Sequence, residues 1–163
     1  MSKQRCTRTP GAVRIGPAAL AVAAALAVAV PASAAIVPGV GASGVRLGDS
    51  KAKVKSVLGA PEKGSNTLNY RYIGRHGVGI YFIADQAFEI SVVRGREATS
   101  AGIRIGSPLA RLKKAYPKAR CTPSLAQRRV LECRLKGSLK GKGTQTMFTV
   151  KAGKVATIVV RFA

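Results

Sequence analysis

Side chains that perform acid–base or nucleophilic chemistry are scarce in this sequence. The 163 residues include one histidine, His76, and six acidic residues. His76 falls between the glycines of 74–77, where we expect a solvated turn, and a Ser-His-Asp triad would need a carboxylate to hold its imidazole. Asp49 is better explained as a helix cap, and no spacing pairs the other carboxylates for glycoside chemistry. We therefore predict a protein that is not an enzyme and uses no cofactor.

The three cysteines are the other reactive side chains. Cys6 lies near the N-terminus, in a segment that we expect to be removed. Cys121 and Cys133 are typical of an exported protein with one disulfide, which would contribute about 3 kcal/mol by restricting the unfolded chain. A metal or nucleophile site is the alternative, but two thiols and one histidine are too few ligands for a closed zinc site. We predict a disulfide and no metal site.

Basic side chains dominate the composition, with 28 lysines and arginines and a formal net charge of +22. Residues 44–101 have nine basic and five acidic residues, net +4, whereas residues 102–163 have 15 and one, net +14. Such an excess favours anionic partners. We predict that the basic residues between 111 and 142, opposed only by Glu132, converge on one anion-binding patch. They are Arg111, Lys113, Lys114, Lys118, Arg120, Arg128, Arg129, Arg134, Lys136, Lys140 and Lys142.

The first 34 residues have the three parts of a secretory signal peptide. Four basic residues and no acid precede residues 17–30, PAALAVAAALAVAV, and Ala-Ser-Ala at 32–34 offers small side chains to a peptidase. We expect cleavage after Ala34, with cleavage after Ala35 as the alternative, and a secreted protein of net charge +18. A retained membrane anchor is disfavoured because the apolar run is shorter than the ~20 residues that a span requires.

An internal repeat is the strongest architectural signal. Residues 44–59, GVRLGDSKAKVKSVLG, match residues 102–117, GIRIGSPLARLKKAYP, at an offset of 58. Further on, at an offset of 68, Ile90 matches Ile158. These matches predict four segments: a signal peptide at 1–34, an N-terminal linker at 35–43, a first repeat at 44–101 and a second repeat at 102–163.

Each repeat opens with a helix signal. Asp49 and Ser107 stand at the expected N-caps, and Val54 and Leu112 begin apolar stripes at helical spacing, so we expect them to be equivalent core positions. Alternating residues then predict antiparallel strands with one covered face, and we read residues 137–144 as a flexible basic hairpin loop. The fold class is α+β: a tandem repeat of a short helix followed by antiparallel strands, forming one sheet with helices on one face. The expected strands are residues 68–72, 78–83, 88–92, 130–135, 146–150 and 155–162.

This order of elements resembles the secreted beta-lactamase inhibitor protein of actinomycetes. The phrase GVRLGDSKAKVKSVLGAP, residues 44–61, also resembles the small outer-membrane assembly lipoproteins, whose single copy has the same helix-then-strands order. The resemblance implies a sheet whose face or hairpin loops bind another macromolecule, and the Cys121–Cys133 pair is similar to a disulfide of the inhibitor. The inhibitor presents an acidic hairpin, whereas the turn at 74–77 is basic here, so no functional residue is carried over.

Two classes of binding function fit these features. The first is a secreted, strongly basic, non-enzymatic binding module for an anionic polymer or an anionic membrane surface, in the envelope or the environment. The alternative is a protein-binding inhibitor or assembly factor with an acidic protein partner. Polyanion binding weakens steeply with salt through counterion release, whereas a packed protein interface depends more on buried aromatic and arginine anchors.

Overall fold

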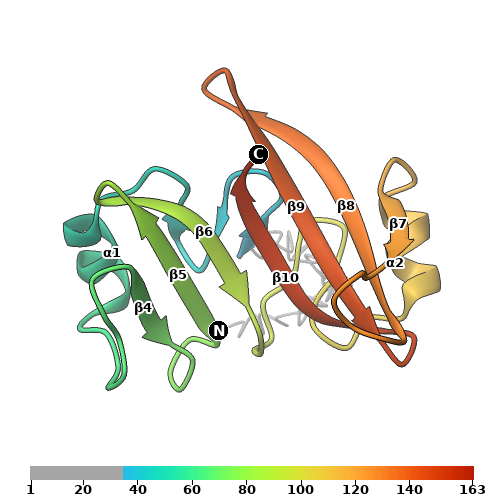
Figure 1. Ribbon diagram of the computed structural model, residues 1–163, viewed down its shortest axis with the longest axis horizontal. Helices are drawn as coiled ribbons and strands as arrows, with labels where there is room; N and C mark the ends of the chain where they lie inside the picture. Colours follow the sequence, from blue (N-terminus) through green and yellow to red (C-terminus); the bar gives the residue numbers. More distant parts are fainter. Residues whose placement is uncertain (1–34) are drawn as a thin grey trace, which may run out of the picture. The chain divides into compact units, whose positions relative to one another are not determined.

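The computed structural model describes residues 35–163, so the predicted signal peptide and Cys6 lie outside the described residues. Two short helices, α1 (Lys51–Leu58) and α2 (Leu109–Ala115), accompany an antiparallel sheet of seven strands (Figure 1). From one edge to the other the strands are β4 (Asn69–Tyr72), β5 (Val78–Ile83), β6 (Gln86–Val92), β10 (Lys154–Phe162), β9 (Lys142–Lys151), β8 (Val130–Leu139) and β7 (Arg120–Pro123).

The strands differ from the expected ones in two places. The short edge strand β7 was not expected, because its four residues show no apolar alternation. The expected loop at 137–144 is instead the end of the β8–β9 hairpin, and only Lys140 and Gly141 turn the chain. Both have positive φ, 50° and 78°, which suits the tight turns that match strand twist. Backbone pairing therefore continues through a glycine-rich stretch.

A second, smaller sheet replaces the expected linker at 35–43. It consists of β1 (Ile36–Val37), β2 (Gly41–Ala42) and β3 (Val45–Arg46). Ile36 is fully buried, and β2 contacts both β6 and β10. The expectation of one sheet is therefore not confirmed, and an apolar side chain and paired backbone groups anchor residues 36–46 to the core.

The start of each helix is held by hydrogen bonds that differ from the expected caps. Ser50, not Asp49, caps α1: its hydroxyl accepts the Lys53 N–H at 3.2 Å. Asp49 instead accepts the Arg46 N–H at 2.8 Å, closing the preceding turn. The α2 cap is Pro108, whose side chain has no acceptor. In that segment the Ser107 hydroxyl accepts the Arg104 N–H at 3.0 Å. The expected cap residues therefore stabilise the turns before the helices.

The core lies between the helices and one face of the seven-stranded sheet. Val54 of α1 and Leu112 of α2 are both fully buried, as expected for core positions. Lys55 of α1 lies over the Tyr70 ring, while Tyr116, just after α2, stacks on Phe148 with ring centroids 5.5 Å apart. Strand register carries Tyr70 and Phe148 to the same face. Both helices therefore cover one face, which Figure 1 shows from the opposite side.

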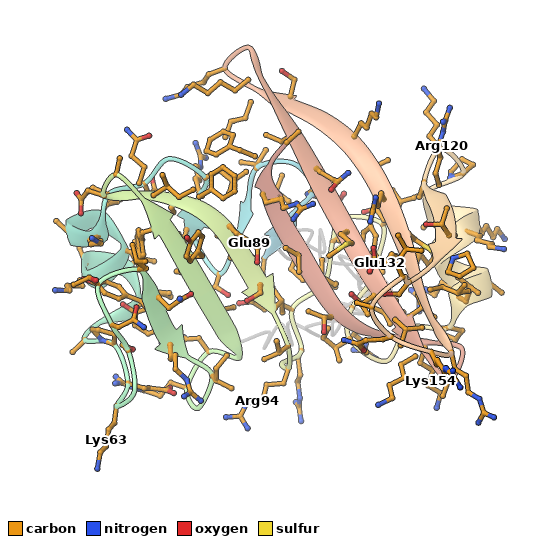
Figure 2. All side chains as sticks on the ribbon, in the orientation of Figure 1. Lys63, Glu89, Arg94, Arg120, Glu132 and Lys154 are labelled. Atoms are coloured by element: carbon orange, nitrogen blue, oxygen red, sulfur yellow. A yellow bond between two sulfur atoms is a disulfide. The ribbon has the colours of Figure 1, made fainter. Side chains whose placement is uncertain are left out.

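The other face of the seven-stranded sheet carries no helix, and we call it the open face. Residues that alternate with the core positions lie on it, among them Glu89 of β6 and Glu132 of β8 (Figure 2). Register aligns them in rows that run across the strands. One row joins Arg71, Gly79, Ser91, Val159, Met147, Arg134 and Arg120, and the next joins Asn69, Tyr81, Glu89, Arg161, Gln145 and Lys136.

Candidate anion-binding site

The structure separates the eleven predicted patch residues into four places, although all eleven are exposed. Arg111, Lys113 and Lys114 lie on α2, on the covered side of the sheet. Arg128 and Arg129 lie between β7 and β8, whereas Lys140 and Lys142 lie at the β8–β9 turn. Strand β8 has ten residues, so these two pairs stand about 30 Å apart. A long hairpin therefore separates the two ends of the predicted patch.

Four of the eleven residues do come together, at the β7 end of the open face. We call them the β7–β8 cluster: Lys118, Arg120, Arg134 and Lys136 all line one surface cavity of about 440 Å³. Arg120 and Arg134 are direct partners on adjacent antiparallel strands, Lys136 lies two residues further along β8, and Lys118 lies in the turn before β7. Arg120 stands at the β7 edge of the molecule in Figure 2.

The cross-strand placement of like charges is energetically unusual. Like charges directly opposite each other destabilise a sheet, whereas opposite charges stabilise it by about 0.2–1 kcal/mol. Within residues 35–163, no carboxylate lies within ion-pair distance of Lys118, Arg120 or Lys136. The cavity is therefore a place where an anion would relieve repulsion that the fold itself leaves in place.

Glu132 is the one acidic residue beside the cluster. Its carboxylate accepts a hydrogen bond from the Arg134 guanidinium at 2.6 Å and one from the Ser124 hydroxyl at 2.8 Å. The hydrogen bond from Arg134, followed by that from Ser124, lowers the pKa of Glu132 below its ordinary value. Glu132 therefore stays ionised at neutral pH and offsets part of the charge of Arg134, leaving the other three cations uncompensated.

A chain of polar contacts reaches the cavity from the first half of the protein. Arg161 of β10 lies 3.8 Å from the Glu89 carboxylate of β6 and donates a hydrogen bond of 3.1 Å to Oε1 of Gln145. Gln145 lines the cavity together with Thr122. Sequence reasoning missed Gln145 and Thr122 because neither is charged. Alternation along the expected strand at 146–150 could have placed Gln145 on the open face once that strand was extended.

The structure also places the two cysteines and the histidine that the sequence singles out. Cys121 and Cys133 form the predicted disulfide, with an S–S distance of 2.01 Å, between paired positions on β7 and β8. His76 lies in the turn between β4 and β5, its ring 6.2 Å from that of Tyr72. Within residues 35–163, no three histidine, cysteine or acidic side chains gather as metal ligands would. No helix of this part of the chain has the length and apolar character needed to cross a membrane.

The β7–β8 cluster is thus the strongest candidate site that the geometry offers, and the comparisons with known proteins neither add to it nor compete with it. No protein-family model, curated protein or solved structure matches this chain significantly.

Proposed function

We propose that this protein is a secreted, non-enzymatic binding module whose β7–β8 cluster holds an anionic polymer or anionic surface. The observation that carries the proposal is the pair of opposed like charges, Arg120 with Arg134, flanked by Lys118 and Lys136 around one cavity. Repulsion of this kind destabilises the sheet and attracts anions, and an anionic ligand bound at these residues would offset it. The disulfide on the adjacent pair of positions is compatible with export.

We also propose that residues 44–101 and 102–163 are tandem copies, which is the architecture that the inhibitor resemblance implies. Corresponding backbone bonds support it: the Gly48 N–H donates to the Ala87 oxygen at 2.8 Å, and the Gly106 N–H to the Val155 oxygen at 2.7 Å. The β6–β10 pairing is reciprocal as well, with Ile90 opposite Val160 and Val92 opposite Ile158. In this reading the second copy has acquired the basic cluster at its outer edge.

An acidic protein partner is the second candidate function, and the position of β7 favours it. This strand ends the sheet, so its outer backbone groups are free to pair with an added strand. Leu125, in the loop after β7, is fully exposed. A partner strand with acidic side chains would combine backbone pairing with neutralisation of Arg120, and its binding would depend less steeply on salt than polymer binding.

Two quadruple variants with the same loss of charge test the site. In the cluster variant, Lys118, Arg120, Arg134 and Lys136 are replaced by Gln; in the control variant, Arg104, Arg111, Lys113 and Lys114 are replaced by Gln. All eight residues are exposed, and each variant loses two arginines and two lysines.

We expect the cluster variant to elute from heparin at much lower salt than the wild type, and the control variant to elute close to the wild type. The slope of log affinity against log salt should become shallower by about 0.7–0.9 for each anionic group that the variant no longer neutralises. Equal losses in the two variants would mean that net charge alone governs retention, and retention of neither variant nor wild type at low salt would refute polyanion binding.

A further inference from the structure

We infer, building on the proposed function, that the β7–β8 cluster recognises a phosphomonoester group, and that Gln145 donates a hydrogen bond to it. Four of the seven residues that line the cavity are lysine or arginine, whose side chains have no acceptor atom. The Gln145 oxygen in the lining already accepts from Arg161, and the carboxylate of Glu132, beside Arg134, already accepts from Arg134 and Ser124. A ligand must therefore bring several acceptor oxygens and negative charge.

The arrangement of the two guanidinium groups favours a tetrahedral group over a planar one. Arg120 and Arg134 extend from opposite positions on neighbouring strands and line the same cavity, so one ligand can contact both. A carboxylate has two oxygens, which a single bidentate arginine occupies. A phosphomonoester offers three acceptor oxygens in different directions and carries a charge of about −1.5 to −2 at neutral pH. It can therefore engage both arginines while Lys118 and Lys136 supply further charge.

Gln145 adds an oriented neutral donor. The Arg161 guanidinium donates to Gln145 Oε1 at 3.1 Å, which leaves the amide NH₂ as the part of this side chain that is free to donate into the cavity. Arg161 is itself held by Glu89 at 3.8 Å. Glu89 and Arg161 therefore act as positioning residues, and through them the first half of the protein helps to orient a donor in the second.

The pH dependence of the ligand gives a first test, made on the purified protein expressed from its full-length sequence. The charged groups at the cavity are Lys118, Arg120, Arg134 and Lys136, with Glu132 beside Arg134, and Glu132 stays ionised between pH 5.0 and 7.5 because hydrogen bonds from Arg134 and Ser124 lower its pKa. The second ionisation of a phosphomonoester occurs near pH 6. Affinity for inorganic phosphate and for phosphorylated dextran, measured by calorimetry, should rise several-fold over this interval, whereas affinity for dextran sulfate should stay constant.

The two phosphate probes distinguish a free ligand from a polymer. Inorganic phosphate should bind weakly and displace phosphorylated dextran, whose linked groups bind more tightly through their high effective concentration. If inorganic phosphate fails to displace the phosphorylated polymer, or if dextran sulfate and polyglutamate bind as well at equal charge, recognition of the phosphomonoester is refuted. The cluster and control variants on heparin would still decide the proposed function independently.

Substitutions test the role of the amide. Gln145→Leu should weaken phosphate binding about tenfold, the usual effect of losing a hydrogen bond to a charged group, and should lower the ratio of phosphate to sulfate affinity. Glu89→Gln should lower that ratio by a smaller factor at an unchanged melting temperature, and Glu89→Asp should restore part of it. Thr157→Val, on the same face but outside the cavity lining, is the control. An unchanged ratio in Gln145→Leu would overturn the assignment of Gln145.

Discussion

At the scale of single residues, what a cation can contribute to anion binding depends on whether a carboxylate is paired with it. Arg134 and Arg161 are both paired with carboxylates, Glu132 and Glu89, whereas Arg120 has none within the described chain. The sequence predicted Lys118, Arg120, Arg134 and Lys136 as members of a basic patch, and all four are exposed in the structure. It could not predict that they gather, because their proximity depends on the pairing of β7 with β8.

Replacing Glu132 should change retention on heparin in the opposite direction from replacing the cations of the β7–β8 cluster. Glu132→Gln keeps a hydrogen-bond acceptor for Ser124 but removes the negative charge that offsets Arg134. We expect elution from heparin at higher salt than the wild type. Asp85→Asn removes one charge in the first half, at an exposed position, and should change elution only slightly. An elution position for Glu132→Gln at or below that of the control would show that Glu132 does not attenuate the site.

The stability of the fold should depend on pH through Glu132, and the sign of this dependence follows from the lowered pKa of its carboxylate. Because the folded-state pKa of Glu132 is lowered, its contribution to stability is present above the unfolded-state value and is lost as pH falls through the folded-state value. Protonation also frees Arg134. Acid therefore weakens the fold locally while it strengthens the positive potential of the cluster, and both effects belong below about pH 4.5.

At the scale of elements, local signals predicted more than long-range ones. The positions of α1 and α2 and of six strands of the main sheet follow from apolar spacing that acts within each segment. The sequence does not predict strand β7, because RCTP has no such pattern, and it predicts a loop at residues 137–144, because glycines weaken strand propensity. What orders them is backbone pairing with β8 and β9, a constraint that no local window contains. Fully buried Thr146 adds to it by accepting the Gly39 N–H at 2.7 Å.

The disulfide links β7 to β8 and so holds the edge strand against the sheet. Cys121 and Cys133 are paired positions adjacent to the Arg120–Arg134 pair, and they face the core side. Replacing both cysteines by Ser should lower the free energy of unfolding by about 3 kcal/mol, because the unfolded chain gains conformational freedom when the disulfide is absent. It should also release the edge strand, whose opposed cations repel each other.

Hydrogen exchange of the β7 amides, together with elution from heparin, measures both effects. We expect faster exchange in residues 120–123 than in the wild type, with unchanged protection in β5 and β6, and earlier elution. Equal protection of β7 in the variant and in the wild type would show that backbone pairing alone suffices to hold the strand.

At the scale of the whole molecule, only some of the basic residues that make the second half more positive lie at the candidate site. Of the fifteen basic residues in 102–163, four form the β7–β8 cluster, and others lie on α2 or at the ends of the β8–β9 hairpin. The helix-side cations face away from the open face, so they contribute to the long-range potential that attracts anions without contacting them. Composition thus indicates the class of partner, and topology decides which cations can touch it.

The N-terminal segment leads to the last prediction, which concerns the site of processing. The Ala35 carbonyl accepts the Ser43 N–H at 2.9 Å, and the next residue, Ile36, is fully buried, with its N–H directed at the Ala98 oxygen at 3.3 Å. Cleavage after Ala35 would remove the acceptor for Ser43 and would place the new ammonium group on a buried residue, which is costly without a compensating partner. Cleavage after Ala34 keeps both hydrogen bonds.

We therefore expect the secreted protein to begin at Ala35, as measured by intact mass and N-terminal sequencing of material from the culture medium. Ala34→Tyr, which places a large side chain at the cleavage position, should reduce release and leave precursor in the cells. Secreted protein that begins at Ile36 would mean that the peptidase acts without regard to the folded contacts of Ala35, and secreted protein that still carries Met1 would overturn the predicted signal peptide.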